Sequence, residues 1–163
     1  MLKEKRYFMG LRDTLTSAVS SLMLERPLKN KDMAEIAQDL DLAGGRLKHT
    51  FAAAKDSSDN RRLLSHIIGI ERWGQSRLRV ALGEPLTMDE YDRYRPPQEA
   101  TWPELQDAFQ ETRQQTVAVT QALGKANVVD VKVPHNQFGP LSLRSWLRYL
   151  EMHANLEAKK LKS

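Results

Sequence analysis

The sequence predicts an all-α protein, a bundle of four long helices with an additional helix at the N-terminus. Apolar residues recur every three or four positions through most of the chain, which is the pattern of one buried face of an α-helix. Glycines, prolines and short polar segments separate these stretches, as they do between helices. A length of 163 residues suits one domain, so we expect residues 1–163 to form a single helical-bundle domain.

The first two predicted helices lie in the N-terminal third of the chain. An apolar stripe predicts a helix over about 5–25, and Pro27 would end it. A second stripe predicts a helix over about 31–55 that contains Gly44 and Gly45. Because the stripe keeps its phase across both glycines, we expect one continuous helix that is weak or closely packed at this point.

The third and fourth predicted helices are bounded by turn and capping signals. Polar residues at 55–60 offer an N-cap for a helix over about 60–83, with Gly83 at its end. Three prolines among charged residues make 84–100 a predicted loop. Thr101 and Glu104 have the Thr-x-x-Glu spacing of a capping box, which predicts a fourth helix over about 102–123, closed by Gly124.

The last part of the chain contains a weak extended signal and one more helix. Residues 127–134 alternate weakly between apolar and polar side chains, so they are candidates for a short extended segment. Gly139 and Pro140 predict a turn. Ser142 is the expected N-cap of a final helix over about 142–161.

The composition excludes several classes of site and partner. The chain has no cysteine, so disulfides, thiolate metal sites and a cysteine nucleophile are excluded. No apolar run approaches the roughly 20 residues of a membrane helix, and no apolar segment follows the charged N-terminus as in a secretory signal. We therefore expect a cytoplasmic protein without a membrane partner. The net charge of +4 comes from scattered basic residues without interleaved aromatics, which does not favour nucleic-acid binding.

Two histidines and a glutamate interrupt the apolar faces of two predicted helices. On the last helix, His153 and Glu157 are four residues apart and lie near the middle of the apolar arc. On the third helix, His66 lies inside the arc between Trp73 and Ile70. A buried, unpaired carboxylate is costly, so another group must compensate it. If the two helices pack together, His66, His153 and Glu157 can converge as a two-histidine, one-carboxylate site for a divalent metal.

A metal-free interpretation stays open for the same residues. An inward-facing histidine is more often a hydrogen-bonded core residue than a ligand, and His153 and Glu157 can pair with each other or with an arginine. Glu71 lies about 140° around the third helix from His66, so it is expected to pair with a basic residue of another helix. His135, in the loop before the last helix, is a candidate residue on the substrate side.

Two segments of the chain resemble the DinB-like (DinB/YfiT) superfamily. Residues 64–73 (LSHIIGIERW) resemble its second bundle helix, which carries one metal-binding histidine. Residues 138–153 (FGPLSLRSWLRYLEMH) resemble the approach to its fourth helix. The resemblance covers about residues 31–161 and leaves the predicted helix over 5–25 outside. It implies an up-down-down-up four-helix bundle, a homodimer, and a divalent metal held by three histidines.

The resemblance also implies which residues would hold the metal. His66 matches the first ligand of the family pattern and His153 matches the second, with zinc or nickel as the expected metal and manganese or iron as further candidates. Glu157 stands where the family pattern has its third histidine. The carboxylate can complete a two-histidine, one-carboxylate site, or the site can be degenerate and metal-free.

The function that the resemblance implies is that of a divalent-metal-dependent enzyme. Such an enzyme would be a transferase or hydrolase that uses a low-molecular-weight thiol and acts on a small-molecule substrate, with the metal as a Lewis acid. His135 or Glu71 would serve as general base or support the metal ligands. The lack of cysteine fits a thiol supplied by a cofactor. The alternative is a metal-free, non-catalytic bundle that binds a small molecule or a partner in a stress response.

Overall fold

The computed structural model describes residues 21–128 and 130–163. Within them the chain is mostly helical, which confirms the predicted all-α class. Most of the helix predicted over 5–25 lies outside the described residues. Its last part forms a π-helical turn, η1 (Ser21–Glu25), and a 3-10 turn follows, η2 (Arg26–Leu28). Among the described residues, none of the helices combines the length and apolar character that crossing a bilayer requires.

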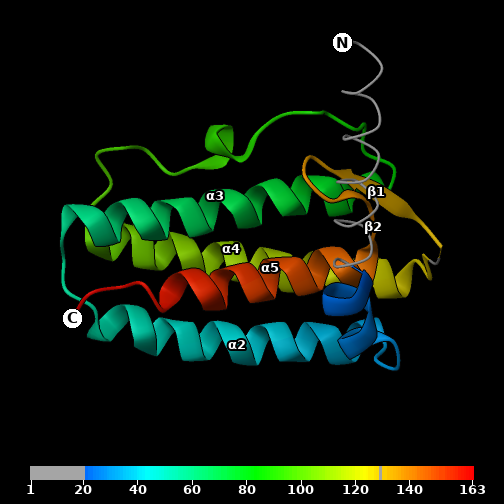
Figure 1. The fold of residues 1–163 in the computed structure, drawn as a ribbon, viewed down its shortest axis with the longest axis horizontal. Coiled ribbons are helices and arrows are strands. Elements are labelled where there is room, and N and C mark those ends of the chain that lie inside the picture. The colour runs from blue at the N-terminus through cyan, green and yellow to red at the C-terminus, as the bar shows by residue number, and fades with distance from the viewer. Residues whose placement is uncertain (1–20, 129) are drawn as a thin grey trace, which may run out of the picture.

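Four long helices form the body of the molecule, each close to its predicted range. They lie side by side, and α2 and α3 each pack against both α4 and α5 (Figure 1). The segment between α3 and α4 runs back along α3 and contains a short 3-10 helix, η3, so α3 and α4 start at the same end of the molecule (Figure 1). The helices are α2 (Met33–Ala53), α3 (Ser58–Val80), α4 (Trp102–Lys125) and α5 (Leu143–Ala158), and η3 is Tyr91–Tyr94.

Side chains cap the helices where the sequence predicted caps. The Glu104 carboxylate accepts a hydrogen bond from the backbone N–H of Thr101 at 2.7 Å, as in the predicted capping box at the start of α4. The Ser142 hydroxyl accepts from the backbone N–H of Ser145 at the start of α5. These bonds satisfy N–H groups that have no partner within the helix, and so they help to define where α4 and α5 begin.

A small β-hairpin precedes α5, and it corrects the prediction of a turn at Gly139 and Pro140. Strand β1 (Lys132–His135) pairs antiparallel with β2 (Gly139–Ser142), so Gly139 and Pro140 begin a strand. The turn lies over 136–138 instead. Its shape is supported by the ring of His135, whose Nδ1 accepts from the backbone N–H groups of Gln137 at 3.1 Å and Phe138 at 3.3 Å. The extended segment predicted over 127–134 is present, but later, at 132–135.

Helix α2 runs without a break through Gly44 and Gly45, and the first of them is the closely packed point. A Cβ atom on Gly44 would lie 2.7 Å from Cγ of Arg113, whereas a Cβ on Gly45 would meet nothing within 4 Å. Gly44 therefore lets α2 approach α4 at the level of a buried arginine. This contact links α2 to a polar part of the protein interior.

Glu71 and Arg113 form a buried ion pair between α3 and α4. Each side chain is almost fully buried, and the two groups are joined by two hydrogen bonds, Nε to Oε1 at 2.7 Å and Nη2 to Oε2 at 2.9 Å. Thr116 donates to the same carboxylate at 2.8 Å, and Arg113 also donates to the backbone carbonyl of Leu40. The expected pairing of Glu71 with a basic residue of another helix is thus confirmed, and the desolvated carboxylate is fully compensated.

Candidate metal centre

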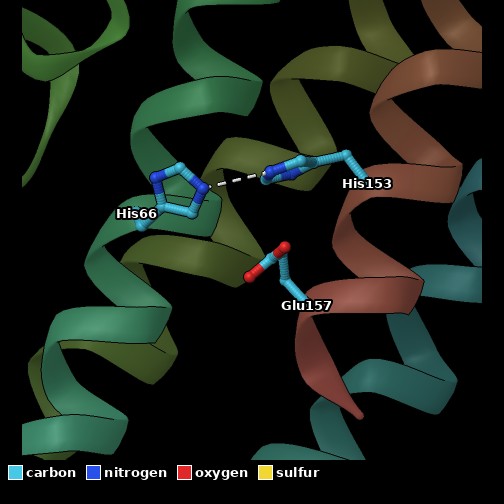
Figure 2. A group of neighbouring side chains, drawn as sticks. All are labelled: His66, His153 and Glu157. Atoms are coloured by element: carbon cyan, nitrogen blue, oxygen red, sulfur yellow. Dashed lines mark hydrogen bonds between the residues drawn. The ribbon is translucent and has the colours of Figure 1, made fainter. Parts of the chain in front are cut away.

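His66 from α3 meets His153 and Glu157 from α5. One donor atom from each side chain lies within 4.8 Å of the other two, and the Nε2 atoms of His66 and His153 are 3.1 Å apart. Figure 2 shows the two rings facing each other across the space between the helices, with the carboxylate of Glu157 beside them. The convergence that the two apolar faces predicted is therefore present in the structure.

Close packing of α3 on α5 brings these side chains together. Gly74 of α3 leaves no room for a side chain, because a Cβ atom there would lie 2.5 Å from Cδ2 of Leu150 on α5. His153 and Glu157 are one helical turn apart, so both project from the same face of α5. The regular geometry of α5 thus supplies two donors, and its contact with α3 supplies the third.

The protonation of the three groups suits metal binding. Burial, and to a lesser extent the nearby His66, lower the pKa of His153 to about 4. Burial also lowers the pKa of His66, with a contribution from the positive charge of Arg95. Burial by itself raises the pKa of Glu157, but the hydrogen bond from Lys160 and the positive charge of Lys160, with smaller contributions from His153 and His66, together lower the pKa below its usual value. At neutral pH the cluster therefore offers two neutral imidazoles and one carboxylate, the forms that bind divalent ions.

The distances within the cluster also fit a shared ion. Two nitrogen ligands of a tetrahedral zinc ion, each at about 2.0–2.1 Å from the metal, lie about 3.3 Å apart. The Nε2 atoms of His66 and His153 are separated by 3.1 Å. A set of two imidazoles and one carboxylate matches the donors of catalytic sites that keep further positions open. The residues of the cluster thus fit a divalent metal.

Each donor of the cluster also has a protein partner. The two Nε2 atoms can share one hydrogen bond, in which one imidazole donates to the other. Lys160 donates to Oε1 of Glu157 at 2.6 Å, from a side chain that is largely exposed. A divalent ion would displace both interactions, and the ion pair it would displace is at the surface, where such pairs contribute little.

Two tyrosines border the cluster and were not singled out from the sequence. The ring of Tyr91, in η3, contacts the ring of His66 edge-on at 5.0 Å, and the ring of Tyr149 lies 5.9 Å from that of His153. Burial raises the pKa of Tyr149 to about 12, so its hydroxyl keeps its proton at neutral pH. A signal for Tyr149 did exist, because it precedes His153 by four residues and Glu157 by eight, on one face of α5. Tyr91 lies in an irregular segment and gave no periodic signal.

The structure does not bring His135 or Glu71 into the cluster. His135 is 4% exposed and lies among the rings of Trp73, Trp146 and Tyr149, with centroid distances of 4.7 to 5.1 Å. It therefore packs behind Tyr149. Glu71 is 1% exposed, and both of its carboxylate oxygens accept hydrogen bonds from Arg113. Neither residue is placed to act as a general base at the cluster, because each side chain is buried in the interior of the protein.

Comparison with known proteins gives one match. A sequence model of the DinB superfamily matches residues 48–156, a segment that contains His66 and His153 and ends directly before Glu157. Neither the curated proteins nor the solved structures contain a match to this sequence. Because the matched segment covers well over half of the 163 residues and carries both histidines of the cluster, the chain belongs to the DinB superfamily.

Proposed function

We propose that His66, His153 and Glu157 bind one divalent metal ion and that the protein is a metal-dependent enzyme. The observation that carries the proposal is the convergence of three donor atoms from two helices within 4.8 Å. A site with three protein ligands is typical of catalytic zinc, whereas structural zinc has four. Zinc or nickel is the metal we favour, and manganese or iron also accept such donors.

We further propose that the reaction is a thiol-dependent group transfer or a hydrolysis on a small-molecule substrate. When bound, the metal supplies a Lewis acid that lowers the pKa of a coordinated thiol or water. The two imidazoles and the Glu157 carboxylate hold that ion, and the protonated hydroxyl of Tyr149 can donate a hydrogen bond on the same side of α5. The chain has no cysteine, so a reacting thiol would come from a low-molecular-weight cofactor.

Metal content tests the proposal directly. Protein prepared without an affinity tag or chelator is analysed by elemental mass spectrometry, for wild type, His66→Ala and Glu157→Ala. His49→Ala is the matched control, because His49 is an exposed histidine on α2, away from the cluster. We expect about one ion per chain in the wild type and in His49→Ala, and loss of the ion from the other two variants. Unchanged metal content in both cluster variants would contradict the assignment.

A metal-free function is the second candidate, because the cluster is also satisfied without an ion. His66 and His153 can bond to each other, and Glu157 already pairs with Lys160. The protein would then be a non-catalytic bundle that binds a small molecule or a partner in a stress response. Wild-type protein that takes up no metal after incubation with excess zinc, nickel, manganese and iron would favour this candidate. The homodimer and the cytoplasmic location expected from the sequence stay predictions.

A further inference from the structure

We propose that Arg62 and Arg95 form a binding subsite for an anionic group, a carboxylate or a phosphate, next to the His66–His153–Glu157 cluster. The inference rests on the proposed function, since it names the substrate class of that site: a small organic anion. Arg62 lies on α3, one turn before His66, and Arg95 follows η3. Both side chains line the same pocket as His66.

Basic side chains predominate in the lining of the pocket beside His66. It has a volume of about 540 Å³ and is open to solvent. Its walls come from α3, from the segment after η3 and from the C-terminal residues, which are far apart in sequence. Four cationic side chains and one carboxylate line it: Arg62, Arg95, Lys160 and Lys162, with Asp59. This excess of positive charge raises the local concentration of anions and favours their binding.

Arg62 is the cation of this pocket that has no close partner among the described residues. Lys162 pairs with Asp59 at 2.9 Å, and Lys160 pairs with Glu157 at 2.6 Å. Arg62 is exposed and forms no hydrogen bond or ion pair with the residues at 21–128 and 130–163, apart from a longer-range attraction to Asp59. Its guanidinium therefore has its five donors available, in the planar arrangement that suits a carboxylate or phosphate.

Arg95 is held in place beside the cluster. Its guanidinium lies over the ring of Tyr91, 5.4 Å from the ring centroid, and its Nε is 2.8 Å from Asp92. The segment that carries it can lie on α3 because Gly69 has no side chain. A Cβ atom there would be 2.8 Å from Cγ of Arg95 and 3.2 Å from the carbonyl oxygen of Tyr91. A cation that is positioned before binding loses little entropy when it takes up an anion.

Arg62 and Arg95 also line a second, larger pocket. This pocket has a volume of about 850 Å³ and continues from the two arginines over Pro96, Pro97 and Leu105. An anionic group bound by the arginines would therefore have the metal ligands on one side and room for a larger organic group on the other. The structure thus favours a substrate or thiol cofactor whose charged group lies between its reacting end and the rest of the molecule.

Lys160 would couple metal binding to anion binding. The ammonium group of Lys160 bonds to Oε1 of Glu157, the carboxylate that would hold the metal. An ion bound by that carboxylate would weaken the pairing and leave Lys160 available to the anion in the same pocket. Coupling between two ligands is reciprocal, so each should increase the affinity for the other.

Binding of small anions by metal-free protein tests the subsite. Inorganic phosphate and succinate are titrated by isothermal titration calorimetry at low ionic strength, with succinamide as the neutral counterpart of succinate. The variants are Arg62→Gln and Arg95→Gln, and Arg93→Gln is the control, because Arg93 is an exposed arginine of η3. We expect the Kd for the anions to rise at least about tenfold in each of the first two variants, as for the loss of a charged hydrogen bond. Arg93→Gln should stay within about twofold of wild type, and the phosphate and succinate arms show which anion is preferred.

Several outcomes would overturn the subsite, and they differ from failure of the proposed function. Anion binding that is unchanged in both arginine variants, or equal binding of succinamide, excludes the subsite. Anion binding that appears only after zinc is added, and that is unchanged in Arg62→Gln, means that the metal alone holds the anion. In that case the metal function stands and this inference falls. If a protein that takes up no metal still binds anions through the two arginines, the subsite stands and the proposed metal function falls. Circular dichroism of each variant confirms that the fold is retained.

Discussion

At the scale of single residues, His135 shows how its surroundings prevent a side chain from carrying charge. Its Nδ1 accepts two backbone N–H groups, so the proton of the neutral ring sits on Nε2. Nε2 is buried and has no hydrogen-bond partner among the described residues. Burial, and to a lesser extent the nearby guanidinium of Arg77, lower the pKa of His135 to about 4. Protonation would therefore place a positive charge among the surrounding aromatic rings, close to the positive charge of Arg77.

This low pKa predicts acid sensitivity that His135→Asn should reduce. An unfolded histidine has a pKa of about 6.5, so between pH 6.5 and 4 the unfolded chain binds the proton more tightly. The stability due to neutral His135 is complete above pH 6.5 and is lost as the pH falls toward 4, by at most about 3 kcal/mol. Urea unfolding of both proteins at several pH values measures this. Asparagine can still accept from the turn N–H groups but does not titrate.

The comparison of the two proteins isolates His135 from other titrating groups. His66, His153 and the carboxylates also respond to acid, but they are the same in wild type and His135→Asn. We expect the variant to be less stable at pH 7, because it loses ring contacts, and to lose less stability on acidification. Parallel pH profiles for the two proteins would show that His135 does not titrate in this window.

Part of the candidate site could be predicted from single residues in the sequence, and part could not. His66, His153 and Glu157 were found because helical periodicity places each polar side chain on an apolar face. Their role as metal ligands stays a prediction. Arg95 could not be found, because it belongs to an irregular segment whose path over α3 depends on its contact with Gly69. No local pattern reports a contact between positions that are 26 residues apart in sequence.

At the scale of helices and strands, the helices were predictable and the hairpin was not. Helices α2, α3, α4 and α5 were located by their apolar stripes, and the starts of α3, α4 and α5 also by capping signals in the sequence. Strand β2 begins with Gly139 and Pro140, which favour a turn when only local preferences are considered. Its pairing depends on a turn that the buried ring of His135 supports, and on packing of Trp146, whose indole donates to the carbonyl of Val133 at 2.9 Å. These contacts form only in the folded protein, so local sequence preferences do not reveal them.

The two adjacent glycines of α2 should respond in opposite ways to alanine. Gly45→Ala is expected to stabilise the protein by about 0.5–1 kcal/mol, because alanine is the better helix former and a Cβ there meets open space. Gly44→Ala is expected to destabilise it by about 1–3 kcal/mol, because the Cβ would lie 2.7 Å from Cγ of Arg113. Arg113 cannot move freely, since Glu71 and the carbonyl of Leu40 hold its guanidinium. Thermal and urea unfolding measure both changes.

This pair of variants has its own internal control. Both substitutions have the same effect on the unfolded chain and on intrinsic helix propensity, so their difference reports the packing of α2 on Arg113. A similar gain in stability for both variants would mean that α2 and α4 can move apart at little cost. It would also mean that the buried Glu71–Arg113 pair does not fix the position of α2.

At the scale of the whole molecule, the cluster joins parts of the chain that are distant in sequence. His66 and His153 are 87 positions apart, and they connect the middle of α3 to α5. An ion held by both helices binds the folded protein and finds no assembled site in the unfolded chain. Such an ion must therefore stabilise the folded state as a whole, and the proposed metal function makes a prediction about stability that is independent of any reaction.

Zinc should raise the Tm of the wild type and leave that of Glu157→Ala nearly unchanged. A free zinc concentration 100 times the Kd adds about 2.7 kcal/mol to the free energy of unfolding. For a chain of this size, that corresponds to about 5–11 °C in Tm. Without metal the two proteins should melt at similar temperatures, because Glu157→Ala removes only an exposed ion pair with Lys160. Scanning calorimetry with and without zinc measures this, and His49→Ala should respond like the wild type. Equal shifts in wild type and Glu157→Ala would mean that zinc acts elsewhere on the protein.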